Sequence, residues 1–229
     1  MWASPTYPFP ELESTCTYKE VCSNSDSVVD RHVDYMMRNG LAVQAQHEQL
    51  PAFYWLPKLH KTPYGTRFIA ASNKCTTKQL STLLTSCFKS ILAHFKQYCG
   101  GIYKHTGVNY FWIDENSVEV LKKRHNINET SRAKYFDSYD FATLYTNIPH
   151  DALKNNVRSL VREAFKVRGA KYLIIDTHGK AHWSQTPAES VSCVSVDKSV
   201  LVEWTDYLID NVYIRVGNKM YRQTIGIPM

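Results

Sequence analysis

Three cationic side chains, Lys58, Lys61 and Arg67, flank a Pro-Tyr-Gly sequence that predicts a turn. We interpret residues 54–70 as two short extended pieces that form a hairpin with these cations projecting from it. Such a hairpin can clamp a triphosphate or a nucleic-acid backbone, because an arginine side chain can bind two phosphate oxygens at once. The alternative is an edge hairpin whose lysines only prevent association with other strands.

A carboxylate ends another candidate strand. Residues 133–140 form a short, aromatic-rich run that ends at Asp140, before threonine, asparagine and proline residues interrupt it. A carboxylate at the rim of a sheet can bind a magnesium ion that keeps water and substrate phosphates as its other ligands. Tyr145 lies beyond the predicted strand end, where its ring can border a ribose. The alternative is that Asp140 caps a turn, as aspartate often does.

The last segment, Gln223 to Met229, combines a glycine and a proline in one loop. A glycine at position 226 allows the backbone to approach a ligand closely. The loop follows a predicted hairpin, residues 211–216 and 219–223, whose turn is the Gly217-Asn218 pair. By itself this pattern indicates only a loop.

Positive charge is concentrated in one part of the chain. The net charge is +6, yet positions 49–113 contain eight lysines and arginines and no acidic residue. This basic window predicts a polyanionic partner, although a solvated basic face is the alternative. Within it, Lys74 and Lys78 can contact phosphates, and the rings of Tyr54 and Tyr64 can stack on bases.

Composition excludes several classes of protein. Hydrophobic residues make up 44% of 229 positions, which is enough for a folded core. The six cysteines include no Cys-x-x-Cys pair, which argues against a zinc ribbon or a disulfide scaffold. No run approaches the roughly 20 apolar residues of a membrane span, and the N-terminus lacks a signal-peptide pattern. We therefore expect a soluble, intracellular protein without a membrane partner.

Amphipathic helices and hairpins are predicted to position these segments. Hydrophobic periodicity predicts helices from Asp26 to Gly40, over 77–98 with Gly100-Gly101 as the stop, over 151–166, and from Asp197 onward. Residues 171–176 and 181–184 predict a further hairpin around His178-Gly179. Helices and strands mix without strict βαβ alternation, which favours an α+β fold. Residues 1–25 contain three prolines and no periodicity, so we expect a loosely held arm.

Four phrases, taken in order, resemble the reverse transcriptase of Penelope-like retroelements, a family related to telomerase. They are YWLPKLHK at 54–61, GTRFIAA at 65–71, DFATLYTNIPH at 140–150 and QTIGIPM at 223–229. They are similar to that family's fingers motifs, its palm motif A and the start of its motif B.

The resemblance covers about residues 30–229 and implies an incomplete right-hand polymerase of the α+β class, with helices packed on an antiparallel sheet. Residues 26–127 would form a fingers-like region of helices and a hairpin. Residues 128–229 would form the N-terminal half of the palm, and they would end within motif B.

The resemblance also implies roles for single residues. Asp140 would be the catalytic ligand of two Mg²⁺ ions, with the carbonyl of Phe141 completing one of them. Tyr145 would be a steric gate that selects deoxynucleotides. The implied partners are an RNA template, a DNA primer and deoxynucleoside triphosphates, and the implied location is the nucleus.

Other implied positions belong to the nucleotide site. Arg67 and one of the lysines at 58 and 61 would grip the phosphates of the incoming nucleotide. Gln223 and Gly226 would lie against the nucleotide and the template base.

One feature departs from the family. Its members supply two further aspartates from a Tyr-x-Asp-Asp hairpin, and this sequence contains no Asp-Asp pair. Asp137 cannot replace them, because residues three apart on a strand project to opposite faces. We expect the intact relative to copy RNA into DNA, and this chain to be a fragment of a longer element or a truncated gene model, without polymerase activity alone. The alternatives are a non-enzymatic nucleic-acid binding remnant and a degenerate copy without a stable product.

Overall fold

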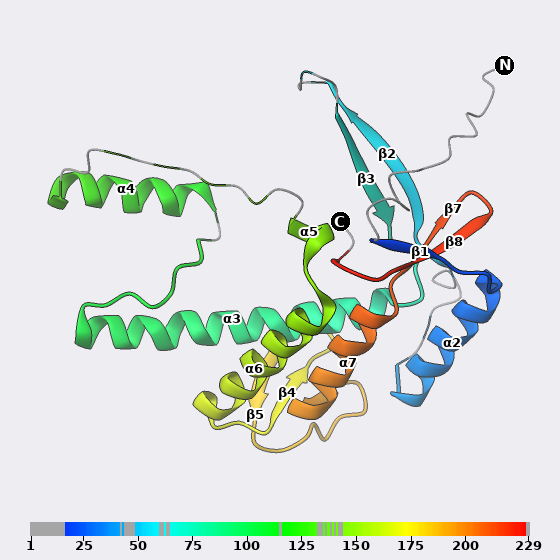
Figure 1. Ribbon diagram of the computed structural model, residues 1–229. Coiled ribbons are helices and arrows are strands. Elements are labelled where there is room, and N and C mark those ends of the chain that lie inside the picture. Colours follow the sequence, from blue (N-terminus) through cyan, green and yellow to red (C-terminus); the bar gives the residue numbers. More distant parts are fainter. Residues whose placement is uncertain are drawn as a thin grey trace. The chain divides into compact units, whose positions relative to one another are not determined.

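The computed structural model describes residues 17–41, 43, 49–59, 62, 65–114, 116–131, 135, 137, 139, 141 and 144–227 (Figure 1). The chain divides into two compact units. The first contains residues 1–90 and 143–229, and the second contains Ile91–Ala142. The side chains of 65–68, 124 and 126–131 lie outside the described part of their strand or helix.

A five-stranded sheet organises the first unit, in the order β1-β8-β7-β2-β3. All neighbours are antiparallel except β2 and β7, which run parallel and pair at Ala52 and Arg215. The predicted hairpin at Gly217-Asn218 is confirmed, and Gly217 adopts the positive φ of 59° that its turn requires. The strands are β1 (Tyr18–Glu20), β2 (Ala52–Lys58), β3 (Gly65–Ala71), β7 (Tyr213–Val216) and β8 (Lys219–Gln223).

The expectation of a loose arm up to residue 25 is wrong for its last part. Residues 18–20 form strand β1 and pair with the outer side of β8. The backbone N–H of Thr224 donates to the carbonyl of Thr17 at 2.8 Å, and Thr17 is buried. The physical reason is that β8 would otherwise present an unpaired edge, which any extended segment can cover. Residues 1–16 lie outside the described part of the chain.

A second sheet of three antiparallel strands has the order β5-β4-β6. Its strands are β4 (Tyr172–Ile175), β5 (Ala181–Ser184) and β6 (Val194–Asp197). The predicted hairpin between β4 and β5 is confirmed, and its turn is closed by the Asp176 carboxylate, which accepts the N–H groups of His178 and Lys180. Strand β6 was not predicted from the sequence.

Six helices are described: α2 (Ser25–Arg38), α3 (Lys78–Thr106), α4 (Ser117–Ser131), α5 (Leu144–Asn147), α6 (His150–Arg168) and α7 (Lys198–Asp210). The predicted helices over α2, α6 and α7 are confirmed, and local chemistry fixes their ends. Asn24 and Asp197 cap the N-termini of α2 and α7, while Gly169 ends α6 with a φ of 67°.

The predicted stop of α3 at Gly100-Gly101 is wrong. The helix continues to Thr106 and ends at Gly107, whose N–H donates to the carbonyl of Tyr103 at 2.8 Å. A glycine costs a helix interior only about 1 kcal/mol relative to alanine, so a pair in a long helix without proline does not end it. Gly107 ends it because it adopts a φ of 69°, outside the helical region.

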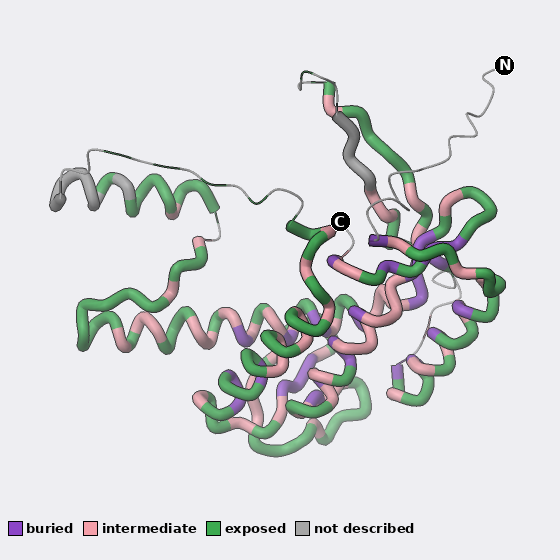
Figure 2. Tube along the Cα trace, in the orientation of Figure 1, coloured by how far each residue is buried: buried purple, intermediate pink, exposed green. Residues whose placement is uncertain are grey.

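Three helices of the first unit pack together, because α7 contacts both α2 and α6. The rings of Tyr35 on α2 and Tyr207 on α7 stack with centroids 3.4 Å apart. Helix α6 lies beside α7, and Lys154 forms an ion pair of 2.9 Å with Asp210 across this contact (Figure 1). Buried residues occur on all three helices and on β4, β7 and β8 (Figure 2). This mixture of packed helices and mainly antiparallel sheets confirms the α+β class.

The segment before α5 differs from its prediction. Tyr135, Asp137 and Tyr139, the described positions of the predicted strand at 133–140, have no regular structure and are exposed. An aromatic-rich run forms a strand only where it can pair with a neighbouring strand and bury one face.

None of the described helices combines the length and apolar character needed to cross a membrane.

Candidate functional site

Two segments that are distant in the sequence meet around α5. The N–H of Gly226 donates to the carbonyl of Ile148 at 2.7 Å, and the N–H of Ile227 donates to the carbonyl of Tyr145 at 2.6 Å. His150 Nε2 lies 2.7 Å from the carbonyl oxygen of Gly226, so this nitrogen carries the proton and donates. We call this contact the α5 junction. It joins two of the phrases on which the family resemblance rests.

Gly226 is the closest point of the α5 junction. Its φ is +79°, in the left-handed region that favours glycine. A Cβ built on it would overlap the carbonyl oxygen of Tyr145 and lie 2.7 Å from the Cα and carbonyl carbon of Thr146. Real side-chain atoms do not approach backbone this closely, so the junction as it stands admits only glycine here. Close approach to a ligand stays a prediction for this glycine, and the contact that the structure shows is with the backbone of Tyr145 and Thr146.

Tyr145 brings a side chain to the same place. Its ring is 49% exposed while its carbonyl is held in the α5 junction. The backbone of the residue is therefore fixed, and its ring stays accessible to a ligand. The structure thus brings together two of the predicted nucleotide-binding positions, Tyr145 and Gly226.

Gln223 lies just before the α5 junction, at the end of β8. Its side chain is only 1% exposed, and its Nε2 donates to the carbonyl of Ile225 at 3.0 Å. Its Oε1 is buried and accepts no hydrogen bond from the described residues. A buried acceptor without a donor costs about 1–3 kcal/mol. In this structure Gln223 therefore shapes the loop that carries Gly226, and its amide oxygen keeps the capacity to accept a hydrogen bond.

The described residues of the α5 junction include neither of the two predicted metal ligands. Asp140 lies outside the described residues, and Phe141 belongs to the second unit, where its side chain is 76% exposed. Within the described part of the chain, no three His, Cys, Asp or Glu residues gather closely enough to hold a metal ion. Asp140 is not among the residues that this statement covers, and we derive no step through a magnesium ion.

The predicted cationic hairpin is formed by β2 and β3, with Lys58 opposite Gly65 in the register. Lys61 and Tyr64 lie outside the described residues. Arg67 lies in β3 opposite Leu56, and its side chain is not described. Strand β3 is at the edge of the sheet, and Lys58 is half-buried.

Aromatic side chains line the same hairpin. Tyr54 and Trp55 are 44% and 49% exposed, and Leu56 beside them is also exposed. Because successive strand residues point to opposite faces, both faces of β2 are open to solvent at this point. Lys74 is exposed in the loop after β3, and Lys78 is half-buried at the first turn of α3.

Two parts of the α5 junction were not predicted from the sequence. His150 and Ile148 hold the loop through hydrogen bonds, but nothing in the local sequence indicates that Gly226, 76 and 78 positions away, is their partner. A scan against protein-family models gives no match for this chain, and a search of curated proteins also gives none.

Proposed function

We propose that the chain is part of an RNA-directed DNA polymerase of the Penelope-like type, with the α5 junction at the edge of its nucleotide site. The observation that carries the proposal is the contact of Tyr145 and Ile148 with Gly226 and Ile227. The two phrases concerned resemble motif A and motif B, and a polymerase must bring these motifs together around one nucleotide.

The chain's own residues would then bind and select the nucleotide. The ring of Tyr145 would close the space that a ribose 2′-hydroxyl needs, while the loop at Gly226 fixes the position of that ring. The cations of the β2–β3 hairpin would bind phosphates. The partners would be an RNA template, a DNA primer and deoxynucleoside triphosphates. The protein would act in the nucleus. Nucleotidyl transfer in the intact protein would use two magnesium ions held by converging carboxylates. Because the sequence has no Asp-Asp pair, we propose that this chain alone does not polymerise.

Nucleotide selection tests the proposal without requiring turnover. With an RNA–DNA hybrid bound, we expect the chain to bind a fluorescent deoxynucleoside triphosphate more tightly than the matching ribonucleotide. Tyr145→Ala should reduce this preference about tenfold, or about 1.4 kcal/mol, because the ring no longer excludes the hydroxyl. Equilibrium titrations followed by fluorescence anisotropy measure both affinities.

Tyr139→Ala is the matched control, because Tyr139 is an exposed tyrosine outside the α5 junction. It should leave the preference unchanged. Equal affinity of the native chain for both nucleotides would contradict the proposed site. Incorporation of nucleotides that depends on Asp140 in a primer-extension assay would contradict the proposed lack of activity.

A second function, a non-enzymatic nucleic-acid binding module, is favoured by the exposed aromatics on the cationic β2–β3 hairpin. Changing Lys58, Lys61 and Arg67 together to alanine should weaken binding of a single strand about tenfold, since each cation lost removes a phosphate contact. Filter binding at several salt concentrations measures this loss, and thermal unfolding should stay unchanged.

The control variant changes three exposed lysines that lie outside this hairpin, Lys19, Lys122 and Lys180, to alanine. It removes the same charge, so it separates a local contact from a general effect of net charge. If both triple variants bind alike, the hairpin has no special role in either function.

A further inference from the structure

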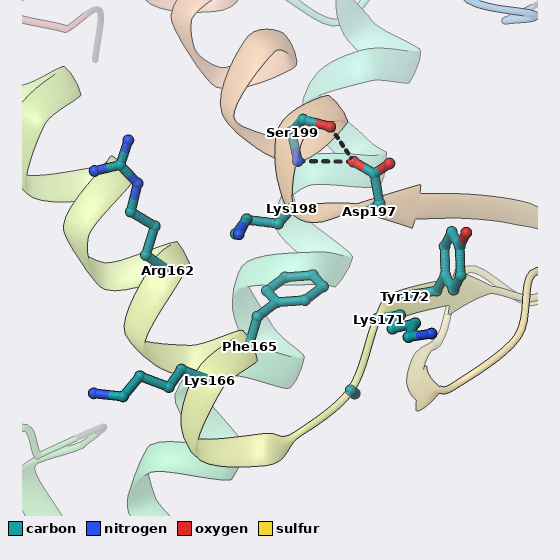
Figure 3. A pocket seen from close by; sticks show the side chains of 9 residues that line it. Arg162, Phe165, Lys166, Lys171, Tyr172, Asp197, Lys198 and Ser199 are labelled. Carbon is teal, nitrogen blue, oxygen red and sulfur yellow. Dashed lines mark hydrogen bonds between the residues drawn. The ribbon is translucent and has the colours of Figure 1, made fainter.

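An open pocket of about 440 Å³ lies in the first unit, and its lining residues are outside the basic window of the sequence. The second half of α6, the start of β4 and the start of α7 form it (Figure 3). Four cations line it: Arg162 and Lys166 lie one turn apart on α6, Lys171 precedes β4, and Lys198 begins α7. Figure 3 shows Lys198 extending from α7 towards α6 near the ring of Phe165, while Arg162 and Lys166 extend from α6 away from that ring.

Among the described residues, only one of these cations has an acidic partner within ion-pair distance. Lys166 forms an ion pair of 3.5 Å with Glu163, and both of these side chains are largely exposed. Such exposed pairs contribute little. No carboxylate of the described residues lies within ion-pair distance of Arg162, Lys171 or Lys198. A cluster of four cations therefore stays available to an external anion.

The one carboxylate that lines the pocket, Asp197, already accepts hydrogen bonds from the start of α7. Asp197 accepts the N–H groups of Ser199 at 2.7 Å and Val200 at 2.9 Å, and also the hydroxyl of Ser199. Burial opposes ionisation of this carboxyl, but these hydrogen bonds and the charge of Lys198 together lower its pKa. Asp197 is thus a charged N-cap of α7, and the pocket keeps an excess of three positive charges.

This arrangement suits a chain of phosphates better than one small anion. The N–H groups at the start of α7 that could surround a free phosphate are occupied by Asp197. The available donors are instead long side chains on three separate segments, and Arg162, Lys166, Lys171 and Lys198 are all exposed. Separate cations around an open pocket can each bind a different phosphate along a polymer.

Two aromatic residues, Phe165 and Tyr172, also line the pocket. Phe165 is buried, and its ring meets that of Trp183 edge to face, with centroids 5.0 Å apart. Tyr172 is half-buried at the side of the pocket near Lys171, where a base can stack on its ring (Figure 3). An acidic peptide would use the cations but would gain nothing from this ring.

We propose that this pocket binds the phosphate backbone of a single-stranded nucleic acid, as a contact separate from the β2–β3 hairpin. The inference goes beyond the proposed polymerase function, because it requires only a nucleic acid and no nucleotide site. It adds residues of α6, β4 and α7 to a binding surface that the charge pattern alone assigned to positions 49–113.

The test is the triple variant Arg162→Ala, Lys166→Ala and Lys198→Ala, in which only exposed side chains are shortened. A labelled single strand of roughly 20 nucleotides exceeds the site size of one binding module. We expect its affinity to fall about tenfold, and the slope of log affinity against log salt to become shallower by about 2, at roughly 0.7 per phosphate contact. Fluorescence anisotropy gives both values, and circular dichroism checks the fold.

The control variant at Lys19, Lys122 and Lys180 should keep the native slope, because those residues do not line the pocket. An equal loss in this control, or no loss in the pocket variant, would overturn the proposal. Displacement of the strand by inorganic triphosphate or polyglutamate at an equal concentration of negative charge would also overturn it. Combining the pocket and hairpin variants distinguishes this site from the proposed function: a loss caused by the pocket should persist when the hairpin cations are absent.

Discussion

Replacing Gly226 with alanine should lower the free energy of unfolding by about 3 kcal/mol. The added Cβ would overlap the carbonyl oxygen of Tyr145 and press on the backbone of Thr146. Overpacking of this kind typically costs about 1–3 kcal/mol, and the left-handed backbone adds about 1 kcal/mol for a residue with a Cβ. Backbone atoms cannot move aside as a flexible side chain does, so the upper part of this range applies. Urea unfolding followed by circular dichroism measures the change.

Gly179→Ala separates the two causes. Gly179 has a similar φ of +74°, and a Cβ built on it meets nothing within 4 Å. This variant should therefore lose only the backbone contribution of about 1 kcal/mol. Equal losses in both variants would show that the α5 junction is not tightly packed, and the main support for the proposed nucleotide site would disappear.

The second large effect is a dependence of stability on pH that comes from His32. This side chain is only 3% exposed, its Nδ1 lies 2.8 Å from the hydroxyl of Thr76, and its Nε2 has no partner among the described residues. The rings of Tyr207 and Tyr213 lie against it. Burial, with a smaller effect of the Arg31 charge, lowers the pKa of His32 from 6.5 to about 4.

The direction of the effect follows from proton binding. Between pH 6.5 and about 4 the unfolded chain binds a proton at His32 and the folded chain does not. Stability is therefore fully present above pH 6.5 and falls as the pH drops towards 4. The shift corresponds to about 3 kcal/mol, which makes His32 a main cause of acid unfolding. Denaturant titrations at several pH values measure this change.

His32→Gln keeps a polar partner for Thr76 but cannot titrate, so its stability should change far less over this range. His178→Gln, at an exposed turn, is the control and should behave like the native chain. If His32→Gln kept the native dependence on pH, another group would be responsible for it.

Local sequence patterns were sufficient for most of the regular elements. The apolar periodicity of α6 and α7, the cap at Asp197 and the turn at Gly217 each act within a few residues, so they can be read without knowing the fold. The same holds for the pairing of β2 with β3, because the two strands follow each other closely in the sequence. The α+β class follows from these elements.

Contacts between distant segments could not be predicted in this way. The pairing of β1 with β8 depends on an unpaired sheet edge about 200 positions away, and the segment at 133–140 lacks a strand at its described positions despite its aromatic run. Gly100 and Gly101 remain helical because the rest of α3 tolerates their cost. In each case the neighbours in space decide between conformations that the local sequence allows almost equally.

The candidate sites were also predicted from the sequence only in part. The sequence identified Tyr145 and Gly226 as residues of interest and predicted that the backbone at Gly226 could approach a ligand closely. Folding determined that the approaching backbone is that of Tyr145 and Thr146. It also gathered Arg162, Lys166, Lys171 and Lys198 from three segments into one pocket. A net charge or a motif is a property of one segment. A site depends on the distances between side chains of different segments, and only tertiary packing determines these distances.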